Sequence, residues 1–356
     1  MSEMPFEIPD IEYKHSELPL YICRFKKIGS TQIWAYNNID KLVDDNKLSP
    51  NMWTLVTADQ MTSGIGSEDS KTGLPRKWYT LEGKNLNLTY IALRLIDENN
   101  EDTSKTDNNN SCSLKLNHSI QNIGFYILSL SLVVCKVIEE FGIKNVKIKW
   151  INDIFVNNKK IGGVICKKLG KIYTFNNMKY EPFVIGIGVN IFHREKEIPV
   201  DVEHPATSLI LENKSNHFDI NLDDISEKMH FNVIKCISRL NSSNDAVFSE
   251  NIVSNYSIIN SKVDFVYLNK VNITIADDNN NFCNYSFKKL VLNEINKRLL
   301  YKGKMVSITE NKLLNEHNNM GIFVGIDENG YAIIKTTDGN INLILTHGRM
   351  KCLTVI

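Results

Sequence analysis

The stretch KWINDIFVNNKKIGGVIC, from Lys149 to Cys166, constrains the fold of this chain most strongly. Two apolar runs flank the turn Asn157-Asn158-Lys159, and this pattern predicts two strands joined by a tight turn. Gly162 and Gly163 on the return strand lack a Cβ, so a ligand could approach the backbone closely there. An ordinary β-hairpin with solvated lysines on its rim fits the same residues, so the segment alone leaves both interpretations open.

The polar residues of this hairpin suit the binding of anions. The turn brings Lys149, Asn152 and Asp153 to one end and places Lys160 at the start of the return strand. A lysine beside backbone amides can neutralise an acid that is held near a phosphate. Asp153 is a candidate for holding Mg²⁺ or for orienting a nucleotide.

The rest of the chain predicts an α/β fold in which strands and helices are mixed. Ser30 or Thr31 can cap a helix that starts at Thr31, and the Gly/Ser-rich segment Thr62 to Gly73 reads as a loop. A longer helix is expected from a cap at Ser119 to Gly142. The other expected elements are strands at 19–25, 53–58, 85–95, 146–150, 154–156, 160–166 and 183–191, and a helix at 223–240.

Composition shifts suggest three parts of the chain. Residues 1–19 are acidic and broken by prolines, and we expect an N-terminal extension there. Residues 20–298 form the expected main domain, in which the Asn-rich stretch 97–117 has the composition of a disordered insertion. From about Ser261 the chain is rich in β-formers, and residues 299–356 carry glycine turns at the spacing of a small barrel. These turns are Gly303, Gly325, Asn329-Gly330, Asp338-Gly339 and Gly348.

Charge and cysteine content exclude several classes of protein. Lysine plus arginine equals aspartate plus glutamate at 41 each, so no global basic field points to nucleic acid. The seven cysteines form no CxxC pair, and the eight histidines show no metal-ligand spacing, so no metal site built on cysteine or histidine is predicted. The N-terminus lacks an apolar signal core, and the stretch from Ile120 to Phe141 is too polar for a membrane span. We therefore expect a soluble, cytoplasmic protein.

Six blocks of sequence occur in the order in which the biotin protein ligases carry them. They are Gly29-Ser30-Thr31-Gln32, Ala58 to Ser67, Arg76-Lys77-Trp78 with Gly83-x-Asn85-Leu86, Lys149 to Cys166, Gly186-Ile187-Gly188-Val189-Asn190, and Ala206-Thr207-Ser208-Leu209. The segment Gly321 to Gly330 resembles a hairpin of that family's small C-terminal domain. The resemblance runs from about residue 20 to the end. It implies a mixed-sheet catalytic domain like that of class II aminoacyl-tRNA synthetases, with a small C-terminal SH3-like β-barrel.

The resemblance also implies roles for single residues. Ser30 and Thr31 would hydrogen-bond the ureido ring of biotin, and Lys160 would contact the biotin carboxylate and the α-phosphate. Lys160, Arg76 and Asp153 would form the catalytic set. Gly163, Gly186 and Gly188 would line the biotin slot, Trp78 would pack near the adenine, and Asn190 would contact the nucleotide. The full expected binding set is Ser30, Thr31, Met61, Gly64, Gly66, Trp78, Lys149, Asn152, Gly163, Ile165, Gly186, Gly188 and Asn190. Taken singly, Trp78 fits a core position, the glycines fit a strand end and Asn190 fits a turn.

The loop around Gly64 departs from the family's pattern. Ile65 and Ser67 stand where relatives carry arginines, and Met61 replaces the usual glutamine. A cation at these positions would stabilise phosphate charge, and Lys71, Arg76 or Lys77 could compensate for its loss. The stretch Gly66 to Thr72 also looks like a phosphate-binding loop, but it lacks the second glycine and carries two acidic residues. We reject that interpretation.

The activity implied by the resemblance is that of a biotin protein ligase. Biotin and Mg-ATP would form biotinyl-5′-AMP, and the biotinyl group would pass to a lysine of a biotin carboxyl carrier domain. The strand edge after Lys160 is the expected docking edge for that domain. A lipoate or octanoate ligase on the same fold, and a degenerate biotin-binding protein with weak adenylation, remain alternatives. Because the resemblance starts near residue 20, no DNA-binding domain is expected; the acceptor protein is left open, and so is a homodimer.

Overall fold

The computed structural model describes residues 20–68, 74–96, 123–199, 204–213, 221–241, 273–276, 282–285, 287–309, 318–336, 342–345 and 349–353. The chain divides into two compact units. The first contains residues 1–123 and 162–193, and the second contains residues 124–161 and 194–356. Strand β8 (Lys159–Lys168) begins in the second unit and continues in the first.

The first unit is built on a mixed sheet with the strand order β1-β2-β5-β10-β8. Strand β1 pairs with β2 in parallel, and the β2–β5, β5–β10 and β10–β8 pairs are antiparallel. The elements of this unit are β1 (Leu20–Ile28), α1 (Thr31–Asp44), β2 (Trp53–Met61), β3 (Gly64–Glu68), β4 (Pro75–Trp78), β5 (Asn85–Leu95), most of β8, β9 (Tyr173–Phe175) and β10 (Met178–Asn190). Strands β3 and β4 form a separate antiparallel hairpin.

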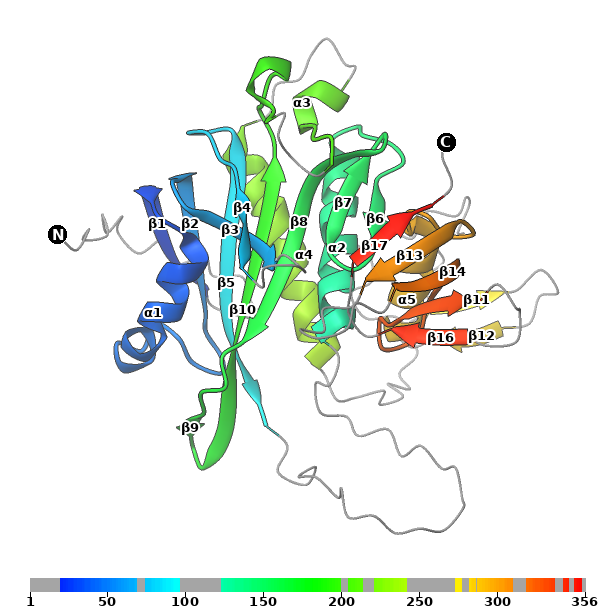
Figure 1. Ribbon diagram of the computed structural model, residues 1–356. Helices are drawn as coiled ribbons and strands as arrows, with labels where there is room; N and C mark the ends of the chain where they lie inside the picture. The colour runs from blue at the N-terminus through cyan, green and yellow to red at the C-terminus, as the bar shows by residue number, and fades with distance from the viewer. Residues whose placement is uncertain are drawn as a thin grey trace, which may run out of the picture. The chain divides into compact units, whose positions relative to one another are not determined.

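Helix α1 covers one face of this sheet (Figure 1). It starts after Ser30, whose hydroxyl accepts a hydrogen bond from the backbone N–H of Ile33, as expected for an N-cap. Ala35 and Ile39, four residues apart on the helix, are fully buried against the apolar cluster to which Ile91 and Val184 contribute. This packing fixes the helix N-terminus over the same face of the sheet.

The second unit combines helices with the β8-β7-β6 end of the eight-stranded sheet, a five-stranded sheet and a short hairpin. The start of β8 is hydrogen-bonded to β7, which is hydrogen-bonded to β6. The five-stranded antiparallel sheet has the order β16-β15-β14-β13-β17. The elements are α2 (Ile123–Glu140), β6 (Lys147–Lys149), β7 (Asp153–Val156), η2 (Glu195–Glu197), α3 (Leu209–Glu212), α4 (Leu222–Asn241), β11 (Ile273–Ala276), β12 (Phe282–Tyr285), α5 (Phe287–Arg298), β13 (Met305–Thr309), β14 (Asn318–Ile326), β15 (Ala332–Lys335), β16 (Asn342–Leu345) and β17 (Arg349–Cys352).

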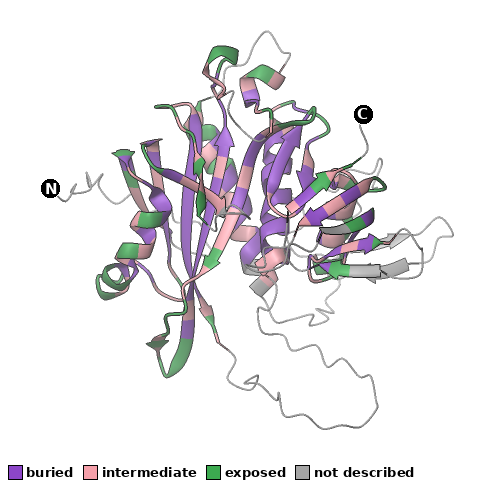
Figure 2. Cartoon of the chain, viewed as in Figure 1, coloured by how far each residue is buried: buried purple, intermediate pink, exposed green. Residues whose placement is uncertain are grey.

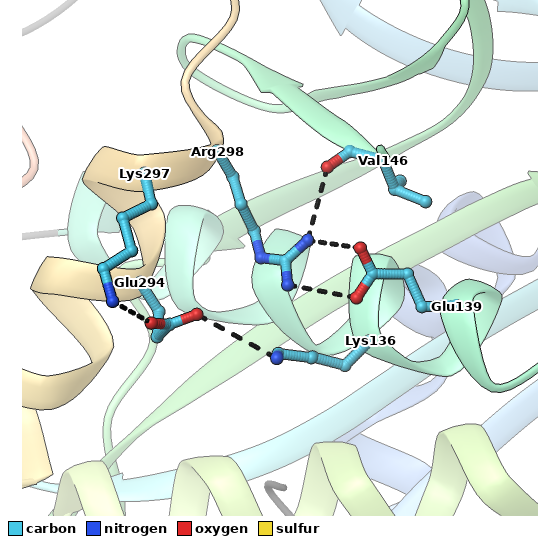
Figure 3. Close-up of polar contacts among 6 residues, drawn as sticks. All are labelled: Lys136, Glu139, Val146, Glu294, Lys297 and Arg298. Carbon is cyan, nitrogen blue, oxygen red and sulfur yellow. Dashed lines mark hydrogen bonds and ion pairs between the residues drawn. The ribbon is translucent and has the colours of Figure 1, made fainter. Parts of the chain in front are cut away.

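Ion pairs join α5 to α2 within the second unit (Figure 3). Arg298 makes a bidentate contact with Glu139, with Nη1 at 2.5 Å from Oε1 and Nη2 at 3.0 Å from Oε2. Its Nη1 also donates to the backbone carbonyl of Val146. Glu294, one turn earlier on α5, lies 3.9 Å from Lys136 of α2. The helix that precedes the small sheet is thus fastened to α2 by charges.

Several elements agree with the sequence-based expectations. The strand Asn85–Leu95 is found as predicted, α1 has the predicted cap, and α2 ends just before Gly142, which has a positive φ of 83°. The turn-rich C-terminal part forms the five-stranded sheet, and the antiparallel pairing fits the expected small β domain. No helix of the described residues is long and apolar enough to cross a membrane.

Two expectations were wrong. The segment 62–73 is not simply a loop, because Gly64–Glu68 forms strand β3 and pairs with β4. The region after Ser261 is not uniformly β, because α5 occupies Phe287–Arg298 and buries Val291 and Ile295, four residues apart. The cap at Ser119, the insertion at 97–117, Asp338-Gly339 and Gly348 lie outside the described residues. The proposed division of the chain at residues 19 and 298 stays a prediction.

Candidate functional site

A polar row interrupts the buried sheet of the first unit. Strand β5 is buried from Asn85 to Leu93 (Figure 2), and its alternate residues Asn85, Asn87 and Thr89 share one face. Directly opposite on β10 are Asn190, Gly188 and Gly186, in that order. On the other side, β8 places Gly163 opposite Gly188 and Ile165 opposite Gly186. The expected slot residues on β8 and β10 are therefore neighbours on one face.

The N-terminus of α1 lies against this face. Thr31 Oγ1 accepts a hydrogen bond from Thr89 Oγ1 at 2.9 Å, and it lies 3.4 Å from Met61 Sδ, to which it donates. Met61 belongs to the end of β2, and its sulfur also accepts from the backbone N–H of Thr31 at 3.5 Å. The expected binding residues Thr31 and Met61 are thus brought together, and they already bond each other.

The glycines of β10 leave room that other side chains fill. A Cβ at Gly186 would lie 2.3 Å from Gln32 Nε2 and 3.1 Å from Ile165 Cγ1. A Cβ at Gly188 would lie 2.8 Å from the indole of Trp78, whose Nε1 donates to Asn87 Oδ1 at 3.3 Å. Neither glycine could carry a side chain without displacing these groups. Trp78 therefore lies over Gly188, within the expected slot.

The β3–β4 hairpin explains both Gly64 and the place of Arg76. Gly64 is paired with Trp78, and a Cβ there would lie 2.7 Å from the Trp78 carbonyl oxygen. Arg76 donates through Nε to the backbone carbonyl of Ser67 at 3.3 Å, and through Nη2 to the Ser67 hydroxyl. Gly66 makes only an ordinary contact, with its Cβ position 3.5 Å from the Arg76 carbonyl. The guanidinium thus lies at position 67, where the family resemblance expects an arginine.

Asn190 belongs to a hydrogen-bond network at the end of β10. Asn85 Nδ2 donates to Asn190 Oδ1 at 3.0 Å, and Asn85 Oδ1 accepts from His193 Nε2 at 2.8 Å and from the backbone N–H of Leu81. All three side chains are buried. Hydrogen bonds within a buried network hold its members in fixed orientations. Asn190 is therefore positioned by the fold, as a binding residue would need to be.

The second unit contains a compact group of charged side chains. Lys149 and Asp153 are paired across the β6–β7 hairpin, and both are buried. Lys160 Nζ lies 2.5 Å from Asp153 Oδ1, and Lys149 Nζ lies 2.6 Å from His204 Nε2. An ammonium group can only donate, so His204 accepts at Nε2. We call Lys149, Asp153, Lys160 and His204 the charged cluster; Asn152 lies in the turn beside it.

The strand edge expected to receive a carrier domain is not free at Lys160. The backbone N–H of Lys160 donates to the Pro205 carbonyl at 2.7 Å, and its own carbonyl accepts from the Thr207 N–H at 2.9 Å. Beyond it, Gly162 to Lys168 pairs with β10. The backbone groups of Lys160 itself are therefore already bonded, and docking of a carrier domain further along β8 stays a prediction.

Sequence reasoning missed several residues that the fold places beside the expected ones. These are Gln32, Asn87, Thr89, His193 and His204. For β5 a signal existed, because Asn85, Asn87 and Thr89 alternate within a strand whose other residues are apolar. His204 gave no such signal, because its contact with Lys149 spans 55 residues of sequence.

Part of the chain resembles known protein ligases in sequence. Residues 107–190 match the model of the biotin/lipoate A/B protein ligase family. The bifunctional ligase/repressor BirA of Bacillus subtilis is 26% identical over 156 residues, which is 44% of this chain and 38% of the relative. The protein of the same name from Bacillus spizizenii is 25% identical over the same length. The match thus spans well under half the length of these curated relatives.

The solved structures extend the likeness to nearly the whole chain. The biotin protein ligase from Aquifex aeolicus in complex with biotin and ATP aligns over 93% of this chain and 98% of its own, with a TM-score of 0.55 and 20% identity. Another crystal structure of the Aquifex aeolicus enzyme gives a TM-score of 0.52 over the same shares. At this identity the likeness concerns the fold. This chain has the biotin protein ligase fold, and its residues 107–190 match the model of the biotin/lipoate A/B protein ligase family.

Proposed function

We propose that this chain is an ATP-dependent biotin protein ligase. It would join biotin to AMP and then pass the biotinyl group to a lysine of a biotin carboxyl carrier domain. The solved relative with this fold is described in complex with biotin and ATP, which supports both small molecules as substrates. The protein would act in the cytoplasm on a carboxylase, without binding nucleic acid.

The observation that carries the proposal is the glycine surface of β10. Gly186 and Gly188 lie on one face beside Gly163, and neutral side chains surround them: Thr31 and Gln32, which are buried, and Trp78, which is partly buried. Glycines on a sheet face let a planar group lie close to the backbone, so a planar ring would take the place that Gln32 and Trp78 now occupy there. Neutral donors and acceptors suit an uncharged polar head group. The bicyclic ureido head of biotin has this chemistry.

The charged cluster fits the other half of the reaction. Lys160 would release Asp153 and place its ammonium between the biotin carboxylate and the α-phosphate, whose charges repel each other. Asp153 is the carboxylate that would then hold Mg²⁺, and the ion would supply further neutralisation of phosphate charge. Lys149, held by His204, would add a second fixed cation.

The reaction needs two displacements. A carboxylate oxygen of biotin attacks the α-phosphorus of ATP, and the bond to pyrophosphate breaks as the new P–O bond forms. The amine of the acceptor lysine then attacks the acyl carbon of the mixed anhydride, AMP leaves, and the amine loses a proton. Because both steps depend on positioning and charge, the chain needs no nucleophile of its own.

Arg76 would replace one of the missing arginines of the β3–β4 hairpin. Its guanidinium bonds Ser67, the position at which the family resemblance expects an arginine. From there it would act on phosphate charge in the way the resemblance implies. This placement favours a functional ligase over the degenerate binder, in which no cation would remain at that position.

Biotin-dependent exchange of labelled pyrophosphate into ATP tests the proposal. Wild-type protein should catalyse exchange with biotin, and much less with lipoate or octanoate at equal concentration. Exchange that prefers lipoate or octanoate would establish the sister activity instead. Tight biotin binding without exchange in the presence of Mg-ATP would establish the degenerate binder.

A further inference from the structure

Gln32, the second residue of α1, has a buried carboxamide without a hydrogen-bond partner among the described residues. Its side chain is only 4% exposed, and neither Nε2 nor Oε1 is bonded in this part of the chain. Burying an amide without partners costs free energy, and folded proteins rarely leave both ends of one unsatisfied. Such a group calls for a ligand or another functional explanation.

The carboxamide is directed at the glycine surface of β10. A Cβ built on Gly186 would lie 2.3 Å from Nε2 and 3.0 Å from Cδ of Gln32. Thr89 is paired with Gly186 on one side, and Ile165 is paired with it on the other. The amide therefore lies over the glycine position that the proposed function assigns to the biotin slot.

The neighbouring polar groups already have partners. Thr31 Oγ1 bonds both Met61 and Thr89, and Ser30 Oγ accepts from the Ile33 N–H to cap the helix. Asn87 donates to the Ala58 carbonyl and accepts from Trp78. Gln32 alone of these side chains keeps both a donor and an acceptor, side by side, for another molecule.

We propose that Gln32 recognises the ureido group of biotin. Its Nε2 would donate to the ureido carbonyl oxygen, and its Oε1 would accept from the adjacent ring N–H. This inference rests on the proposed function and assigns the contact to a residue outside the set that the family resemblance supplies. The thioether of Met61 cannot donate a hydrogen bond, unlike the glutamine that the resemblance expects at this position. Gln32 would supply the missing amide.

Two variants of Gln32 separate recognition from a structural role. Gln32→Met removes both hydrogen-bonding atoms at similar volume. If the amide serves the ligand alone, this variant should have a Tm equal to or above that of wild type, because a buried unbonded amide is removed. It should bind biotin about tenfold or more weakly by titration calorimetry, since two hydrogen bonds are lost.

Gln32→Glu makes a sharper test with 2-iminobiotin, in which an imine replaces the ureido oxygen. The carboxylate can only accept, so it should disfavour the ureido carbonyl and favour the protonated guanidinium of the analogue. We expect the ratio of iminobiotin to biotin affinity to rise by about 100-fold or more over wild type. The matched control is Asn37→Asp on the exposed face of α1, which makes the same amide-to-acid change and should leave both affinities unchanged.

The outcomes distinguish this inference from the proposed function. Wild-type protein that binds biotin, together with Gln32→Met and Gln32→Glu variants of unaltered affinity and preference, would overturn the role of Gln32 and leave the ligase proposal standing. A Gln32→Met variant that loses stability as well as binding would show a structural amide, and would also overturn it. Wild-type protein that does not bind biotin would overturn both.

Discussion

The two units of this protein treat buried polar groups in opposite ways. In the first unit the side chains of the candidate site are neutral. Thr31 and Asn87 are hydrogen-bonded to Thr89 and Trp78, whereas the amide of Gln32 has no hydrogen-bond partner among the described residues. In the second unit the charged cluster takes the place of neutral groups, and the ammonium of Lys160 forms an ion pair with Asp153.

The difference follows from what each environment can tolerate. A buried neutral amide costs a few kcal/mol at most when it is unbonded, so a fold can keep one ready for a ligand. A buried charge without a partner costs far more, so the buried carboxylate of Asp153 is paired with the partly exposed ammonium of Lys160 until another cation replaces it. The neutral group thus suits recognition of an uncharged head, and the paired charges suit phosphate chemistry.

The largest effect should come from removing the cation of the charged cluster. Lys160→Ala should lower the rate of biotin-dependent pyrophosphate exchange by about 100-fold or more, as loss of one electrostatic contact to a transition state does. The matched control is Lys159→Ala, which removes the neighbouring exposed lysine and should leave the rate within twofold. Equal rates in all three proteins would remove Lys160 from the mechanism.

The next largest effect should come from filling the glycine surface. Gly186→Ala places a methyl group 2.3 Å from Gln32 Nε2, so the amide must move and the space narrows. We expect biotin affinity to fall by about 10- to 100-fold, a cost typical of 1–3 kcal/mol of overpacking. Gly29→Ala is the control, because nothing lies within 4 Å of its Cβ position. A similar loss of affinity in both variants would contradict this specific role of Gly186.

The charged fastening of α5 gives a smaller, purely structural prediction. Arg298→Met removes the bidentate contact to Glu139 and the bond to the Val146 carbonyl. Hydrogen bonds to charged groups contribute about 1.5–3 kcal/mol, and partial exposure places this one near the lower end. Chemical denaturation followed by hydrogen exchange should locate the loss in α2 and α5. Lys297→Met, on an exposed residue of the same helix, should change stability by about 0.5 kcal/mol or less.

Acid should destabilise the second unit through His230 of α4. Burial lowers the pKa of His230 to about 4, below its ordinary value of 6.5. The unfolded chain therefore binds the proton first, so the stability is intact above about pH 6.5 and falls as the pH drops toward 4. The slope should be about 1.4 kcal/mol per pH unit from this group. Denaturation curves at several pH values should show this excess slope in wild type but not in His230→Gln, and identical slopes would exclude the residue.

The local parts of the fold could be predicted from the sequence. Strand β5 was predictable because its alternation and apolar content extend over eleven residues, and α1 because Ser30 is a strong cap. Strands β3 and β4 were not, because Gly64, Gly66 and Ser67 are poor strand formers that only pairing with Arg76-Lys77-Trp78 holds extended. Helix α5 was missed because only two of its residues are buried, Val291 and Ile295.

Only those residues of the candidate site could be predicted that belong to the sequence blocks shared in order with the biotin protein ligases. The glycines of β10 and the lysine of β8 were expected because they occur in ordered blocks. Gln32 belongs to such a block, but the sequence assigns it no role, because its amide is seen to lack a hydrogen-bond partner only in the folded chain, where it lies over Gly186. The contacts of Arg76 with Ser67 and of Lys149 with His204 likewise depend on the folded chain.

Biotin binding and pyrophosphate exchange, measured side by side on Gly186→Ala and Lys160→Ala, test the division between the two units most directly. The account predicts that Lys160→Ala still binds biotin within about tenfold of wild type but loses exchange, whereas Gly186→Ala loses affinity for biotin itself. A Lys160→Ala protein that no longer binds biotin, beside a Gly186→Ala protein that binds it normally, would contradict the account.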